Sequence, residues 1–175
     1  MCVDWLAHLI RHKAKPQNVR HNSQNHILNK MTALKSLSGK WKGEYICGPE
    51  YENNADRTVE FILELIENNG SISGICIDFE TKEYFAEPIT VSGFIDKDFI
   101  SFIKQYPFFY FIDEQGQVIV DRTKSHPEIT YSGEFNPETN AFFGEWDVIV
   151  DSQKLGDGYF DDSLTGTWTM KRIDN

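Results

Sequence analysis

The chain has 175 residues, of which 40% are hydrophobic and 14% aromatic, and its formal net charge is −10 at pH 7. This length and composition are typical of one globular domain with a substantial core, and they argue against a disordered chain. The charge is uneven, because residues 1–30 are rich in lysine and arginine and the rest is more acidic than the total. An acidic body repels nucleic-acid phosphates and anionic membranes, so we expect neither as a partner.

No run of about 18 or more apolar residues occurs, so we expect no helical membrane span. The apolar stretch 5–10 is too short for a signal peptide, and its basic residues follow it instead of preceding it. Cys2, Cys47 and Cys76 are odd in number and lack metal-ligand spacing. We therefore expect a cytoplasmic protein in which Cys47 and Cys76 are small buried hydrophobic residues.

Residues 1–36 differ from the rest of the chain, since they hold most of the histidines and no glycine. Asp4 is a candidate N-cap for a short helix with an apolar stripe over 5–10, and a polar tether follows Pro16. Met31 is a candidate for the biological start of the chain. We expect a basic N-terminal extension over 1–36 and one domain over 37–175.

From residue 40 onward, segments with strand character follow one another, joined mostly by short turns. Asn68-Asn69-Gly70-Ser71 and Asn136-Pro137-Glu138-Thr139-Asn140 are typical hairpin turns. The segment 59–67 fits both helical and strand periodicity, and the turn after it favours a hairpin over 58–78. The expected strands are 40–47, 59–67, 72–78, 89–95, 99–105, 108–112, 117–122, 129–135, 141–150 and 165–172.

A glycine followed within two residues by an aromatic residue recurs along these segments. Examples are Gly39-Lys40-Trp41, Gly43-Glu44-Tyr45, Gly144-Glu145-Trp146 and Gly166-Thr167-Trp168. Glycine inside a strand indicates a bulge, a bend or a close backbone approach, so these strands are expected to coil. The pattern predicts an all-β fold: a closed antiparallel up-and-down barrel of eight to ten strands, which leaves no exposed strand edge, with a short helical or disordered N-terminal extension.

The first and last strands resemble those of the calycin superfamily of lipocalins, avidins and fatty-acid-binding proteins. Leu37-Ser38-Gly39-Lys40-Trp41 matches the Gly-x-Trp that opens the first strand, and Lys171-Arg172 supplies a basic residue at the end of the last. The resemblance implies that Arg172, or less favourably Lys171, covers Trp41 as a structural plug of one barrel end. It points to no particular member, because the segment 48–57 is a polar loop where fatty-acid-binding proteins have a helix pair.

A barrel interior either packs shut or encloses one small ligand. Aromatic side chains are expected near such a cavity, and the candidates for ligand contact are Tyr45, Tyr131, Trp146 and Trp168. Arg57 and Arg122 are candidates for contact with an anionic head group.

Other clusters of polar residues favour ordinary surface roles. Glu80, Glu83 and Glu87 lie in a polar connection, His126 lies in a loop before a proline, and 151–164 is expected to be a solvated acidic loop and not a calcium site. No hydrolase, nucleotide-binding or metalloprotease motif occurs. We therefore expect no catalytic residue, no metal and no cofactor, although a barrel of this kind can host isomerase or cyclase chemistry.

The segment 99–112 is apolar on both faces, whereas a barrel wall beside water should alternate. Something is expected to cover it: a second copy of the chain in a homodimer, the helix over 5–10, or a ligand surface.

The sequence thus favours an intracellular barrel that binds a small hydrophobic or amphipathic molecule in its interior. The alternatives are a non-enzymatic interaction barrel with a filled interior and, less favoured, an isomerase or cyclase. A connected void with convergent polar groups distinguishes the first from the second, and an enzyme also requires a perturbed titratable group in that void.

Overall fold

The computed structural model describes residues 36–113, 115–155 and 158–173. The N-terminal segment, with Cys2, the expected helix over 5–10 and Met31, lies outside the described residues. The elements in chain order are β1 (Gly39–Cys47), a 3-10 helix η1 (Pro49–Asn54), β2 (Thr58–Asn68), β3 (Ser71–Asp78), β4 (Ile89–Asp96), β5 (Phe99–Gln105), β6 (Phe109–Ile112), β7 (Val118–Asp121), β8 (Ile129–Asn136), β9 (Ala141–Leu155) and β10 (Gly158–Arg172).

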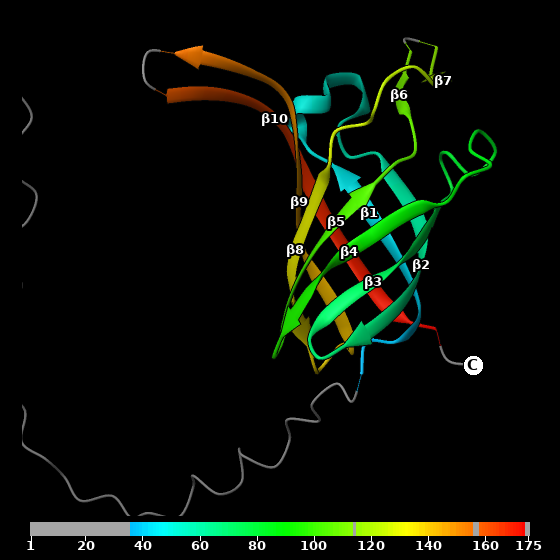
Figure 1. Cartoon of the computed structure of the whole chain (residues 1–175), viewed down its shortest axis with the longest axis vertical. Coiled ribbons are helices and arrows are strands. Elements are labelled where there is room, and N and C mark those ends of the chain that lie inside the picture. Colours follow the sequence, from blue (N-terminus) through cyan, green and yellow to red (C-terminus); the bar gives the residue numbers. More distant parts are fainter. Residues whose placement is uncertain (1–35, 114, 156–157, 174–175) are drawn as a thin grey trace, which may run out of the picture. The chain divides into compact units, whose positions relative to one another are not determined.

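Eight of the strands form a closed barrel in the order β1-β10-β9-β8-β5-β4-β3-β2, and β6 and β7 form a separate two-stranded sheet. All neighbours are antiparallel, and β1 pairs with both β2 and β10, so the barrel has no open edge (Figure 1). The predicted all-β fold with a closed antiparallel up-and-down barrel is confirmed. Among the described residues, no helix is long and apolar enough to cross a membrane.

Alternation along β2 shows why 59–67 forms a strand. Val59, Phe61, Leu63 and Leu65 are buried inside the barrel, while the residues between them are half-buried or exposed. The expected hairpin over 58–78 is confirmed, because β2 pairs with β3 from Asn68↔Ser71 onward. A helix would bury a different set of positions, and the barrel offers an interior only to every second residue.

Several of the glycines in the strands make room for aromatic rings of other strands. A Cβ at Gly166 would come within 2.5 Å of Trp146 Nε1, and one at Gly133 within 2.9 Å of Trp168 Cζ2. Each glycine thus sits beside the indole of another strand, as well as close to a neighbouring backbone carbonyl. At these two positions glycine lets a ring pack directly on the backbone, whereas Gly144 lies against the backbone of β8.

One end of the barrel is filled by large side chains. Trp41 is fully buried there, its ring contacts Phe142 edge-on at 5.6 Å between centroids, and its Nε1 donates a hydrogen bond to Leu37 O at 2.9 Å. The guanidinium of Arg172 lies over the Trp41 ring at 4.7 Å and donates to the carbonyls of Ser36 and Ser38. These contacts join the segment before β1 to the end of β10 and close this end of the barrel.

The opposite end carries the longer connections. Figure 1 places the 3-10 helix η1, the hairpin β6–β7 and the extended ends of β9 and β10 at this end. Two expectations need correction here. The segment 48–57 contains a 3-10 helix and is not simply a polar loop, and 151–164 belongs largely to β9 and β10, which continue their pairing beyond a register shift at Asp162/Ser163. The polar sequence concealed these strands because the side chains of 151–154 and 161–163 are exposed, so it lacks the alternation of a barrel wall.

The apolar segment 99–112 divides between two environments. In β5, Ile100 and Phe102 point into the barrel and Phe99 is exposed, as in any half-buried strand. The second half leaves the barrel and forms β6, which lines a cavity at the open end. Part of its apolar character is therefore explained without a partner.

Candidate functional site

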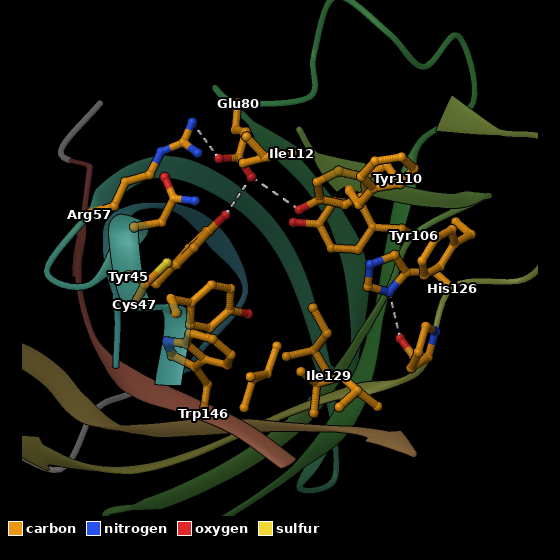
Figure 2. A pocket seen from close by; sticks show the side chains of 18 of the residues that line it. Tyr45, Cys47, Arg57, Glu80, Tyr106, Tyr110, Ile112, His126, Ile129 and Trp146 are labelled. Atoms are coloured by element: carbon orange, nitrogen blue, oxygen red, sulfur yellow. Dashed lines mark hydrogen bonds and ion pairs between the residues drawn. The ribbon is translucent and has the colours of Figure 1, made fainter. Parts of the chain in front are cut away.

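A cavity of about 290 Å³ opens at the end of the barrel where β1 and β5 end and β8 begins. Its walls come from four barrel strands, the helix η1, the connection after β3 and the strand β6 (Figure 2). The side chains that face it are mostly aromatic or aliphatic: Tyr45, Cys47, Tyr51, Tyr106, Phe109, Tyr110, Phe111, Ile112, Pro127, Ile129, Tyr131, Trp146, Val148, Val150 and Leu164, joined by Asn54, Arg57, Glu80 and His126.

One wall is built around the indole of Trp146. Tyr45 and Tyr51 contact it edge-on, with centroids at 5.9 and 5.8 Å, and Tyr131 is stacked beside it at 6.4 Å. Its Nε1 donates a hydrogen bond to Ile46 O, so the ring has a set orientation. Tyr51 reaches this wall because η1 carries it back over the end of the barrel.

The facing wall is a stack of rings from the connection between β5 and β8. His126 lies against Tyr106 at 4.8 Å and against Tyr110 at 5.1 Å between ring centroids. Phe85, from the connection after β3, contacts Tyr110 at 6.0 Å. These contacts hold the hairpin β6–β7 over the cavity.

Glu80 organises the polar side of the cavity. Its carboxylate accepts hydrogen bonds from the hydroxyls of Tyr45 at 3.2 Å and Tyr110 at 3.1 Å, and it pairs with Arg57 at 2.8 Å. Figure 2 shows the two tyrosines approaching Glu80 from opposite sides of the cavity. The Glu80 side chain is only 6% exposed, and this burial raises its pKa, while the Arg57 charge opposes the rise.

Two other titratable groups in the cavity are held in their uncharged forms. Burial lowers the pKa of His126, and the nearby Lys104 charge lowers it further, although the hydrogen bond to Pro127 acts in the opposite direction. Burial also raises the pKa of the Cys47 thiol to about 11. At neutral pH the imidazole is therefore neutral, with Nδ1–H donating to Pro127 O at 2.8 Å, and the thiol is protonated.

His126 makes stability depend on pH in a defined direction. Because its folded-state pKa lies below the ordinary 6.5, the unfolded chain takes up the proton more readily. Its contribution is present above pH 6.5 and is lost as the pH falls through the folded-state pKa. We expect the free energy of unfolding, measured by urea titration between pH 7.5 and about pH 5, to fall more steeply for the wild type than for His126→Gln. Parallel profiles would contradict this account.

A buried ion pair lies next to the cavity. Lys104 Nζ is 2.7 Å from Asp78 Oδ2, the two side chains are 2% and 0% exposed, and Tyr106 donates its hydroxyl hydrogen to the same carboxylate oxygen. The Lys104 ammonium also faces the rings of Tyr45 at 4.9 Å and Tyr131 at 5.7 Å. The pair thereby contacts three rings of the cavity wall.

The structure brings together three of the four aromatic residues singled out from the sequence. Tyr45, Tyr131 and Trp146 line the cavity, whereas Trp168 is buried beside Phe102 and Tyr131, with its Nε1 donating to the carbonyls of Ser132 and Glu145. Of the two arginines, Arg57 lines the cavity. Arg122 lies at the surface, 3.5 Å from Glu87.

Sequence reasoning assigned Glu80 a surface role, which is wrong: it is buried in the cavity. It treated His126 as an ordinary loop residue, and this side chain also lines the cavity. Nothing in the polar connection around Glu80 indicates that this side chain is buried. The many aromatic residues at 106–112, in contrast, could have indicated that this segment lines a cavity together with its neighbours. Cys47 and Cys76 are buried and free, as expected.

Within the described ranges, no group of three or more histidine, cysteine or acidic side chains is arranged to hold a metal ion. The chemistry that the cavity supports is hydrogen bonding and ring stacking around one buried carboxylate.

No family model and no curated protein matches the chain. Among solved structures, it is similar to a crystal structure of rhizavidin, with a TM-score of 0.39 and 11% identity over 77% of this chain and 84% of that one. A rhizavidin–biotin complex gives a TM-score of 0.40 and 12% identity over 80% of this chain and 96% of that one. Neither similarity identifies a ligand for this chain.

Proposed function

We propose that this barrel binds a small hydrophobic or amphipathic molecule in the cavity at its open end. The observation that supports this most is the division of the interior: one end is packed around Trp41, and the other keeps about 290 Å³ of space between aromatic walls. This volume is close to the lower end of the range for ligand sites, about 300–1,000 Å³.

The polar groups in the cavity also favour binding over a filled interaction barrel. Glu80, Arg57 and the hydroxyls of Tyr45 and Tyr110 converge on one side of the cavity, and apolar side chains make up most of the rest. A few placed polar groups in an apolar concavity are typical of small-molecule sites. A barrel that serves only as a scaffold has no need of such an arrangement.

Filling the cavity is expected to abolish binding without unfolding the barrel. Val148 on β9 is buried and lines the cavity, while its neighbour Ile149 is exposed on the outer face. We expect Val148→Phe to weaken binding of the uncharged dye N-phenyl-1-naphthylamine at least tenfold, because the added ring occupies ligand space. Dye fluorescence measures the affinity, and the matched variant Ile149→Phe should bind as the wild type does.

Circular dichroism should show both variants folded. Absence of dye binding to the wild type, together with no small molecule retained in native mass spectrometry of gently purified protein, would contradict the proposal. Equal binding by the two variants would place the dye elsewhere.

The outer wall supports a second proposal, a homodimer that includes residues of the 99–112 region. Phe94 on β4 and Phe99 on β5 are exposed and contact each other with centroids 6.1 Å apart, and Phe143 on β9 is exposed as well. Exposed aromatic residues of this kind favour an interface. Static light scattering of the full chain tests it, and a monomer at high protein concentration would exclude it.

A further inference from the structure

We propose that the cavity selects an uncharged aromatic molecule of one to three rings whose buried end carries an N–H or O–H donor. This inference rests on the proposed binding function and adds the chemical class of the ligand. Three properties of the described cavity residues support it: how their charges are paired, how their rings are placed, and which hydrogen-bonding groups are already used.

The charges next to the cavity are compensated in pairs. Arg57 lies 2.8 Å from Glu80, and Lys104 lies 2.7 Å from Asp78 beside the tyrosine rings. His126, the remaining basic side chain among the described lining residues, is held neutral by its burial. A charged ligand would lose its hydration here and find no uncompensated partner, which makes its entry costly.

The rings on the two walls suit a flat ligand. Trp146 and its tyrosine neighbours form one wall, and Tyr106, Tyr110 and His126 form the other (Figure 2). Aromatic pairs gain from stacked and edge-on contacts beyond the area that they bury. The modest volume of about 290 Å³ favours a molecule of one to three rings over a long lipid chain.

Most of the donors on the two walls are already engaged. The hydroxyls of Tyr45 and Tyr110 donate to Glu80, and the Nδ1–H of His126 faces Pro127 O. Each of these groups is left with an acceptor: an oxygen lone pair on each tyrosine and Nε2 on the neutral imidazole. The indole N–H of Trp146 and the hydroxyl of Tyr106 are likewise used within the protein, on Ile46 O and Asp78.

Next to Tyr45, Tyr110 and His126, a ligand must therefore supply the hydrogen. On the Trp146 wall, the hydroxyl of Tyr51 makes no hydrogen bond within the described residues and can donate one to a second polar atom of the ligand. At the rim the situation differs, because Asn54 and the rest of the Arg57 guanidinium add donors there. A neutral ligand with a polar substituent directed toward that rim satisfies both regions. Indoles and phenols have the required ring and donor and carry no charge at neutral pH. Fatty acids lack the ring and are anionic, and nucleotides and alkylammonium ions are excluded by their charge.

The test compares ligands that differ in one property. Indole and benzofuran have nearly the same shape, but only indole has a donor, and indole-3-carboxylate adds a negative charge. By calorimetric titration of the full chain, we expect indole to bind about three- to tenfold more tightly than benzofuran, the effect of about one hydrogen bond. We expect indole-3-carboxylate and the cation tryptamine to bind at least tenfold more weakly than indole.

A triple variant locates the acceptors. Tyr45→Phe, Tyr110→Phe and His126→Phe together keep the rings and remove the three acceptors. They are made in a background of Glu80→Met and Arg57→Met, because loss of the two hydroxyls would otherwise free the Glu80 carboxylate to accept the ligand's hydrogen. Relative to that background, the ratio of indole to benzofuran affinity should fall to about one. A ratio of one in the wild type, tighter binding of either charged analogue, or a ratio that survives in the triple variant would each overturn the inference. If N-phenyl-1-naphthylamine binds while indole shows no preference, the ligand class fails and the binding function stands; if no probe binds, the binding function fails.

Discussion

Replacing Lys104 with methionine is expected to lower the free energy of unfolding by about 3–5 kcal/mol. The substitution leaves the Asp78 carboxylate fully buried without its cation, and Oδ1 of Asp78 has no hydrogen-bond partner among the described residues even in the wild type. A buried charge without a partner is among the most destabilising changes that a core can undergo. Urea unfolding followed by tryptophan fluorescence measures the loss.

A double variant separates the cost of a lone charge from the value of the pair. Lys104→Met with Asp78→Asn removes both charges and leaves an amide oxygen to accept the Tyr106 hydroxyl, so it should regain most of the stability. Lys104→Met as stable as the wild type would show that the pair is not buried as described.

The ion pair is expected to persist over the whole physiological pH range. Burial alone would lower the pKa of Lys104, but the Asp78 carboxylate beside it, with smaller contributions from Cys76 and Tyr131, holds this pKa well above the ordinary 10.5. Stabilisation by a raised lysine pKa is complete below pH 10.5 and is lost only as the pH rises through the folded-state value.

Replacing Trp41 with alanine is expected to lower the free energy of unfolding by about 3–5 kcal/mol, the usual cost of emptying a large aromatic site in a core. Trp41 is fully buried, contacts Phe142, and lies beneath the Arg172 guanidinium. The change also removes the hydrogen bond from its Nε1 to Leu37 O, which ties the segment before β1 to the barrel. Thermal and urea unfolding both report the effect.

Arg172→Met is the matched comparison, since it removes the cation over the ring and keeps the ring. A partly exposed guanidinium over an indole contributes about 0.5–1 kcal/mol, so this variant should lose much less stability than Trp41→Ala. Equal losses would mean that Arg172, and not the packing of Trp41, closes this end of the barrel. Because the cavity lies at the other end, Trp41→Phe should bind N-phenyl-1-naphthylamine like the wild type.

The stability losses expected for Lys104→Met and Trp41→Ala concern two different parts of the barrel interior. Around Trp41, Phe142 and Met170 the barrel is packed as a core, and toward Tyr45 and Trp146 it leaves space. The ion pair of Lys104 and Asp78 adjoins the cavity wall, and Tyr106 contacts both the pair and the cavity. Stability at the packed end allows the open end to keep polar groups and space that a fully filled barrel would not have.

Several strands of the barrel could be predicted because the residues that specify them, alternating apolar positions and turn residues, are close together in the sequence. The turn Asn68-Asn69-Gly70-Ser71 favoured a strand over a helix for the segment before it. The structure confirms this strand as β2, whose alternate residues face the barrel interior. The extended pairing of β9 and β10 was missed, because strands exposed on both faces have no apolar alternation. The helix η1 was missed for a similar reason, since it is only six residues long and mostly polar.

The sequence by itself indicated an up-and-down barrel and most of its strands, because period-two alternation and turn residues act between near neighbours. It left open which strand faces point inward, and it did not show that β6 and β7 form a sheet of their own. Only the tertiary structure decided the cavity. Glu80, Tyr110 and Tyr45 belong to three connections or strands far apart in the chain, and closure of the barrel brings them within hydrogen-bonding distance. A glutamate in a polar loop looks the same in sequence whether it is solvated or buried, because its environment is set by segments that the loop itself does not contain.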